Sequence, residues 1–130
     1  MHVKNCNYNS KLIDLIKLNL TKDLLKKPYR KLNEENPTYG HCYVATETMY
    51  HMMVESNLND PFKPYYGKDK DNITHWWLEN NIGDKLDITS DQYTLVGKKP
   101  PYHVGRRASF LTNHPSKRAK ILMEKVKLCV

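Results

Sequence analysis

The sequence predicts an α+β fold built as a single domain over residues 1–130. Segments with apolar residues at helical spacing occur early and at the end of the chain, and a stretch rich in β-branched and aromatic residues lies between them. A chain of 130 residues suits one domain with one modest core. Runs of one element type followed by runs of another are typical of the α+β class.

The first predicted helix covers residues 10–27, with Ser10 able to cap its start and Pro28 ending the pattern. Its apolar residues recur at helical spacing between lysines and aspartates: Leu12, Ile13, Ile16, Leu20 and Leu24. Residues 28–41 read as a loop. A second helix is predicted from about Cys42 to Ser56, with a repeating apolar face behind Cys42 formed by Ala45, Met49 and Met53.

The next segment, residues 57–72, is rich in proline, glycine and charge, which predicts an exposed and mobile loop. Residues 73–78 then read as a strand and residues 85–88 as a short partner strand. The sequence between them, Asn-Asn-Ile-Gly-Asp, is typical of a turn, so these two strands predict a hairpin.

Two weaker strand candidates follow at residues 93–96 and 102–106. The final predicted helix runs from Pro115 to Leu128, with Asn113 or His114 near its cap and proline in its first turn. Its outer face is strongly basic. The chain therefore begins and ends with helices, and most of its predicted strands lie in the second half.

The net charge is +7, from 21 lysines and arginines against 14 acidic residues. This balance permits an anionic ligand such as a nucleotide, a nucleic acid or an acidic protein. No apolar run approaches the roughly 20 residues of a membrane helix, and the N-terminus lacks a secretory pattern. We therefore expect a cytoplasmic protein without membrane contact. Abundant Asn and Lys hint at an AT-rich bacterium or a phage, so the cytoplasm could be that of an infected host.

The chain lacks the common signatures of metal and cofactor sites. Its three cysteines match no zinc spacing, and no His-Glu-x-x-His, zinc-deaminase, Walker or Rossmann pattern occurs. We therefore expect neither a metal nor a cofactor.

One constellation of residues could carry out chemistry. Cys42 opens the second predicted helix, where unpaired N–H groups and the helix dipole favour the thiolate. His75 lies in the first strand of the hairpin, and Asp87 lies in its second strand. Cross-strand neighbours are about 5 Å apart, so Asp87 could orient His75 as the acid and base for a Cys42 nucleophile. Each residue also has an ordinary structural interpretation, since Cys42 could be a small core residue, His75 a buried histidine and Asp87 a turn residue.

A family resemblance rests on three short motifs. Residues 35–45 (ENPTYGHCYVA) resemble the segment around the cysteine of the YunG-like proteins, an uncharacterised bacterial and phage family. Residues 74–77 (THWW) and 83–93 (GDKLDITSDQY) resemble its histidine strand and its Asp-Leu-Thr-like segment. The order of Cys, His and Asp is also similar to that of papain-like enzymes, including transglutaminases and NlpC-type peptidases. This resemblance implies a papain-like fold, a cysteine-bearing helix packed on a small antiparallel sheet, with Cys42, His75 and Asp87 as a catalytic triad.

The resemblance also has a departure. Papain-like peptidases often place a glutamine shortly before the cysteine as an oxyanion donor, and this chain offers Asn36 instead. Asn36 could donate its side-chain amide together with the Cys42 backbone N–H. It could equally be a turn residue before Pro37.

Two further sets of residues are candidates for binding. Strand alternation puts one of Trp76 and Trp77 beside His75 and the other on the opposite face, so one can be core and the other, with Trp76 as the candidate, can line a substrate cleft. Arg106 and Arg107 precede the last helix and could hold a phosphate or carboxylate, or simply form a solvated turn.

The sequence thus supports two hypotheses. The first is a cysteine hydrolase or acyltransferase acting on an unknown amide or thioester substrate. The second is a basic, non-catalytic binding protein for a nucleotide, a nucleic acid or an acidic protein, possible for a phage-encoded inhibitor of a host system.

Overall fold

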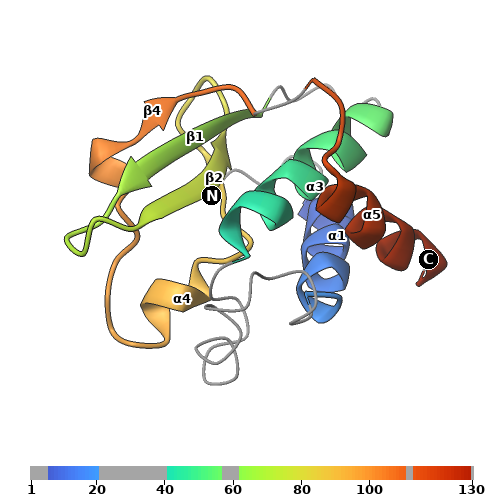
Figure 1. The fold of residues 1–130 in the computed structure, drawn as a ribbon, viewed down its shortest axis with the longest axis horizontal. Helices are drawn as coiled ribbons and strands as arrows, with labels where there is room; N and C mark the ends of the chain where they lie inside the picture. Colours follow the sequence, from blue (N-terminus) through green and yellow to red (C-terminus); the bar gives the residue numbers. More distant parts are fainter. Residues whose placement is uncertain (1–5, 21–40, 57–61, 111–112, 130) are drawn as a thin grey trace.

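The computed structural model describes residues 6–20, 41–56, 62–110 and 113–129, and these confirm the α+β class. Helix α3 (Cys42–Glu55) lies between a four-stranded sheet and the helix pair α1 (Cys6–Leu18) and α5 (Lys117–Leu128), as Figure 1 shows. The strands are β1 (Lys63–Lys68), β2 (Thr74–Glu79), β3 (Lys85–Leu86) and β4 (Arg106–Arg107). They pair antiparallel in the order β3-β2-β1-β4. A short helix α4 (Asp91–Thr94) and a 3₁₀ turn η2 (Tyr102–Val104) connect β3 to β4.

Helix α3 is buried on nearly all sides because it has neighbours on opposite faces. The predicted apolar face is confirmed, and the polar residues Thr46, Glu47 and Thr48 are buried as well. The core around α3 takes side chains from α1, β2, α5 and the segment after β3, including Ile16, Leu78, Ile88 and Leu122. A helix enclosed in this way gives its first residue, Cys42, a fixed position relative to the sheet.

Helix α5 is anchored to α3 by a buried carboxylate. Glu47 is fully buried, and its two carboxylate oxygens accept hydrogen bonds from the Ser116 backbone N–H at 2.8 Å and from the Ser116 hydroxyl at 2.7 Å. The same hydroxyl oxygen accepts a bond from Ala119 N at 3.3 Å, so Ser116 is the N-cap of α5 in place of Asn113 or His114. The negative charge also faces the positive end of the α5 dipole.

Strand β1 corrects the prediction of an exposed loop over residues 57–72; residues 57–61 lie outside the described part. Residues 63–68 pair along their whole length with β2, from Lys63 opposite Glu79 to Lys68 opposite Thr74. Proline and glycine in this segment argued against a strand. However, Gly67 is required here by packing, since a Cβ at this position would lie 2.9 Å from the Pro101 carbonyl oxygen.

The predicted hairpin of β2 and β3 is confirmed, with Leu78 opposite Leu86. Its turn is held by Asn80, whose side-chain oxygen accepts hydrogen bonds from Ile82 N at 3.2 Å and Asp84 N at 2.9 Å. Gly83 takes φ +87°, a left-handed conformation that glycine adopts readily. Strand β3 has two residues rather than the four predicted, so Asp87 lies directly after its end.

The two weaker strand candidates are largely wrong. Residues 91–94 form helix α4, because after Ser90 the backbone closes helical hydrogen bonds such as Thr94 N to Ser90 O at 3.0 Å. Residues 102–104 form the 3₁₀ turn that follows Pro100 and Pro101, and only Arg106 of the candidate 102–106 joins a strand. This turn carries Tyr102 toward the end of β3.

Helix α1 is shifted toward the N-terminus relative to the prediction of 10–27. It begins at Cys6 and ends at Leu18, where the Asn19 side chain donates to the Leu15 carbonyl at 2.8 Å and so satisfies one of the last helical carbonyls. Residues 21–27 lie outside the described part. No helix within the described ranges is long and apolar enough to cross a membrane.

Candidate active site

The two faces of β2 have different neighbours. Alternation places His75 and Trp77 on one face and Trp76 on the other. His75 and Trp77 are fully buried, and their rings stack with centroids 5.8 Å apart. Trp76 is partly buried beside Tyr43 of α3, at 4.9 Å between ring centroids. The candidate base therefore lies on the face of the sheet that α3 does not cover.

His75 and Asp87 form a buried, hydrogen-bonded pair. Nε2 of His75 lies 2.7 Å from Oδ2 of Asp87, and the two side chains are 0% and 4% exposed. The Tyr102 hydroxyl donates to the same oxygen, also at 2.7 Å. Two donors on one oxygen fix the carboxylate and, through it, the imidazole ring.

The surroundings raise the pKa of His75 to about 9 from its ordinary 6.5. Burial is the largest single influence and lowers the pKa, because a charged ring loses its hydration. The hydrogen bond to the Asp87 carboxylate and the interaction with the Cys42 thiol together outweigh that loss. His75 is therefore an imidazolium at neutral pH, with Asp87 as its counter-ion.

Cys42 lies beside His75 at the first residue of α3. The preceding residue, His41, is the N-cap and makes no side-chain capping hydrogen bond, so Cys42 is the first residue within the helix. The Cys42 thiol is 9% exposed and donates to the Thr74 carbonyl oxygen with Sγ at 3.6 Å, one residue before His75. The Cys42 thiol is also one of the groups that raise the pKa of His75.

The second ring nitrogen of His75 is uncommitted. Nδ1 is buried and has no hydrogen-bond partner within the described part of the chain. An orphaned buried N–H is rare in folded proteins. Because Asp87 holds Nε2, Nδ1 is the atom left to exchange a proton with a group at the start of α3.

Tyr93 of α4 closes the other side of the imidazole. Its ring meets the His75 ring edge-on at 4.9 Å, and its hydroxyl donates to Oδ2 of Asp69 at 2.8 Å. Burial and this hydrogen bond raise the Tyr93 pKa above its ordinary range, so the phenol stays neutral. Tyr102 is neutral for a related reason, since burial and the Asp87 charge raise its pKa.

The sequence analysis did not identify either tyrosine as part of the site, although a weak signal was present for each. Tyr102 follows Pro100-Pro101, where a tight turn was as good an interpretation as a strand. Tyr93 follows the turn-forming residues 87–91, which favour a short helix as readily as a loop. In both cases the strand prediction hid a residue that contacts the His75–Asp87 pair.

Three of the other candidate residues can now be placed. Trp76 belongs to an aromatic cluster with Tyr66, Tyr43 and Phe110 on the α3 face, on the opposite face of β2 from His75. Arg106 and Arg107 do not lead into α5 but form β4, where successive side chains point to opposite faces. The expected position directly before the last helix is therefore wrong, and anion binding by either guanidinium stays a prediction. Asn36, the candidate oxyanion donor, lies outside the described residues.

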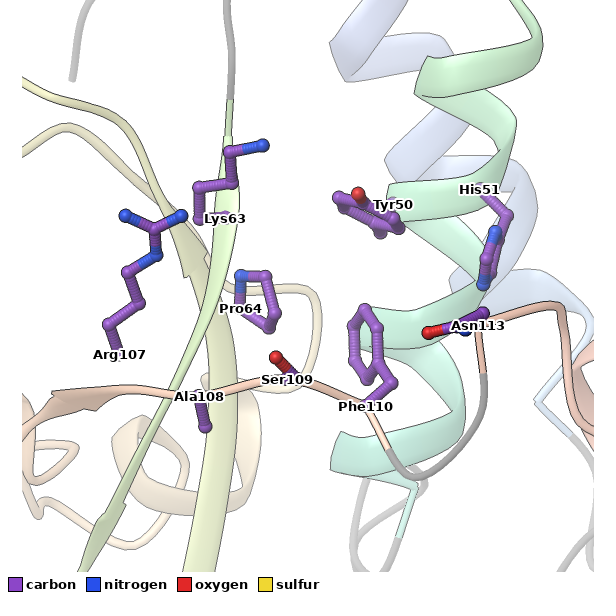
Figure 2. Close-up of a pocket in the computed structure, with 9 residues that line it drawn as sticks. All are labelled: Tyr50, His51, Lys63, Pro64, Arg107, Ala108, Ser109, Phe110 and Asn113. Atoms are coloured by element: carbon purple, nitrogen blue, oxygen red, sulfur yellow. The ribbon is translucent and has the colours of Figure 1, made fainter.

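A pocket of about 220 Å³ lies away from the triad residues, and Figure 2 shows its lining. Its walls come from the edge formed by β1 and the segment after β4, and from the second half of α3. Arg107 lines this pocket and Arg106 does not. Cys42, His75 and Asp87 are absent from its lining, so the pocket is separate from these three candidate residues.

Within the described ranges, no group of three or more His, Cys, Asp or Glu side chains is placed to hold a metal ion. No family model, curated protein or solved structure matches this chain. Function must therefore be argued from the residues themselves.

Proposed function

We propose that this protein is a cysteine-nucleophile hydrolase or acyltransferase acting on an amide or thioester. Cys42 is its nucleophile, His75 its acid and base, and Asp87 the residue that orients His75. The proposal includes a papain-like arrangement, in keeping with the resemblance of residues 35–45, 74–77 and 83–93 to the YunG-like proteins.

One observation carries the proposal: the buried bond of 2.7 Å from His75 Nε2 to Asp87, with Nδ1 without a hydrogen-bond partner among the described residues and the Cys42 thiol bonded to the carbonyl of the preceding residue, Thr74. A histidine serving only the core would be expected to satisfy both ring nitrogens. A carboxylate on one nitrogen leaves the other nitrogen available as the proton acceptor that a thiol nucleophile needs.

The reaction would proceed in two steps. The reactive form is the ion pair in which the Cys42 thiol has given its proton to Nδ1 of His75. The thiolate attacks the acyl carbon and the bond to the amine or thiol leaving group breaks, while the imidazolium gives its Nδ1 proton to that leaving group. Water or an acceptor amine then attacks the thioester carbon and passes its proton to Nδ1, and the bond to Cys42 Sγ breaks. Asp87 holds the ring by Nε2 throughout. Backbone N–H groups at the start of α3 are the donors available to the oxyanion.

Alkylation by iodoacetamide as a function of pH is the direct test. Tryptic peptides containing Cys42 and Cys129 are followed separately by mass spectrometry. If Cys42 is the nucleophile of an active site, it should be alkylated many-fold faster than Cys129 although Cys42 is buried and Cys129 is exposed. Equal profiles for the two cysteines would remove the enzyme proposal.

Matched variants extend the test to catalysis. With p-nitrophenyl acetate as the acyl donor, the wild-type chain should show a burst of p-nitrophenol and an acetyl group on the Cys42 peptide. Cys42→Ser should lose both signals, and Cys129→Ser should keep them. Acetylation spread equally over both cysteines would count against a dedicated nucleophile.

A further inference from the structure

The α3 face of the sheet carries a row of aromatic and basic side chains. Cross-strand partners point to the same face, so Arg106 of β4, Tyr66 of β1 and Trp76 of β2 form a row across three neighbouring strands. Tyr43 of α3 contacts the end of this row at Trp76, with 4.9 Å between ring centroids. The row therefore lies on the opposite face of the sheet from His75.

Two cations lie at the outer end of this row. Lys68 follows Tyr66 by two positions on β1, which makes it the diagonal neighbour of Arg106 on the same face. Both basic side chains are exposed, and neither has an ion pair within the described part of the chain. Because like charges at this spacing repel each other, a carboxylate bound between them would be attracted by both.

The carboxylates nearest to Lys68 along the chain have other partners. Asp69 accepts hydrogen bonds from the Tyr93 hydroxyl at 2.8 Å and from the Asp71 backbone N–H at 2.9 Å. Asp71 pairs with Lys98 at 3.6 Å. The two cations of the row are therefore available to an external anion, and an anion there would relieve their repulsion.

The rings of the row stack on one another. Trp76 stacks with Tyr66 and with Phe110, at 5.4 and 5.9 Å between ring centroids, and both Trp76 and Tyr66 remain partly exposed. A nucleobase needs a free ring face on which to stack, and the faces of Trp76 are used within the protein. Ring edges carry a partial positive charge and suit apolar side chains and carboxylates. The row therefore favours a peptide over a nucleic acid.

We propose that this row binds an acidic peptide segment of a partner protein, with Arg106 and Lys68 on an acidic side chain and Tyr66 and Trp76 against an apolar one. Two inter-strand spacings, roughly 10 Å, separate β4 from β2, which is about three residues of extended chain. The expected segment thus carries an acidic residue about three positions from an aromatic or large aliphatic residue. Binding at this row does not depend on the triad being catalytic.

Fluorescence anisotropy with the full chain tests the proposal. The probe is a fluorescein-labelled peptide that repeats Glu-Gly-Gly-Phe, and its controls repeat Gln-Gly-Gly-Phe, which lacks the charge, and Glu-Gly-Gly-Gly, which lacks the ring. The probe should bind more tightly than either control peptide. Equal binding of the three peptides, or no binding of the probe, would overturn the proposal. Tighter binding of labelled oligothymidylate than of the probe would identify a nucleic-acid surface and would also overturn it.

The neighbouring arginine provides the matched control. Arg106→Gln should weaken binding of the probe roughly tenfold, the loss expected for one charge-assisted hydrogen bond. Arg107 pairs with Tyr65 on the opposite face, and Figure 2 shows its side chain on the side of β1 away from α3. Arg107→Gln removes the same charge and should leave the affinity unchanged. Equal weakening by both variants would indicate a diffuse attraction to the basic surface and would overturn the assignment, as would no weakening by Arg106→Gln.

Discussion

The charged side chains near the two ends of α3 differ in whether they have ion-pair partners. At the start of the helix, a buried carboxylate and a buried imidazolium neutralise each other, and Tyr102 adds a second donor to the carboxylate. Toward its end, Lys63 and Arg107 stand beside an open pocket with no ion pair among the described residues. The charges at the first end form an ion pair within the protein, whereas the two cations at the second end have no ion pair among the described residues.

This difference indicates which substitutions should change the free energy of unfolding and which should change the affinity for a ligand. A buried pair costs much to break, since the partner left behind is a charge in a poorly hydrated site. An exposed cation contributes little to the stability of the fold, so its substitution should change the affinity for any ligand that it contacts more than the free energy of unfolding. The Asp87 end is expected to be sensitive in unfolding experiments and the pocket end to be insensitive.

The largest expected effect is that of Asp87→Asn. At about pH 6, where His75 is charged, we expect the free energy of unfolding to fall by roughly 3–5 kcal/mol, because the buried imidazolium loses its counter-ion. Urea unfolding followed by circular dichroism measures the change.

Asp91→Asn provides the control for that prediction. Asp91 pairs with Lys17 at 3.3 Å, but both side chains are about a third exposed, so the loss should stay below about 1 kcal/mol. Similar losses for the two variants would mean that the His75–Asp87 bond is not a special feature of the fold.

The second prediction concerns pH. The pKa of His75 is about 9 in the folded chain and 6.5 in the unfolded chain, so the folded state holds the extra proton between these values. Stability is therefore complete below pH 6.5 and declines as the pH rises through 9, by on the order of 2–3 kcal/mol.

Unfolding curves recorded between about pH 6 and pH 9.5 measure this slope. In Asp87→Asn the slope should largely disappear, since the carboxylate that raises the pKa of His75 is gone. A wild-type stability that stays flat or rises over this range would contradict a charged His75.

The third prediction concerns Tyr102, which contacts Asp87 and not the thiol. Tyr102→Phe should cost about 1–2 kcal/mol of stability, the value of one hydrogen bond to a charged group with the ring packing kept. As a positioning residue it should also move the pH profile of Cys42 alkylation, which a purely structural role would leave in place. An unchanged profile would limit Tyr102 to packing.

These same residues show how much of the candidate site could be predicted from the sequence. Cys42, His75 and Asp87 could be predicted because each depends on local patterns: a helix start, a strand of β-branched and aromatic residues, and a hairpin turn. Asp87 fell within the predicted partner strand, yet it lies just beyond β3, which pairs over only two residues. The strand is two residues shorter than predicted, but Asp87 still contacts His75.

The rest depends on packing between distant segments, which local patterns do not encode. Strand β1 was hidden by Pro64 and Gly67, and Gly67 is needed only because the turn at Pro101 approaches so closely. The same turn at Pro101 also brings the Tyr102 hydroxyl to Asp87. Arg106 and Arg107 looked like one site in the sequence, and only the pairing of β4 with β1 shows that they face opposite ways.

The smallest expected effect is at the pocket end. Lys63→Met and Arg107→Gln should each change the free energy of unfolding by no more than about 0.5 kcal/mol, because neither side chain has an ion pair to lose in the described structure. Relief of their mutual repulsion could even make either change slightly stabilising. Urea unfolding beside the wild type and Arg106→Gln measures it. A loss above about 1 kcal/mol in either variant would show that these cations hold the fold together. The charged groups near the two ends of α3 would then differ only in exposure.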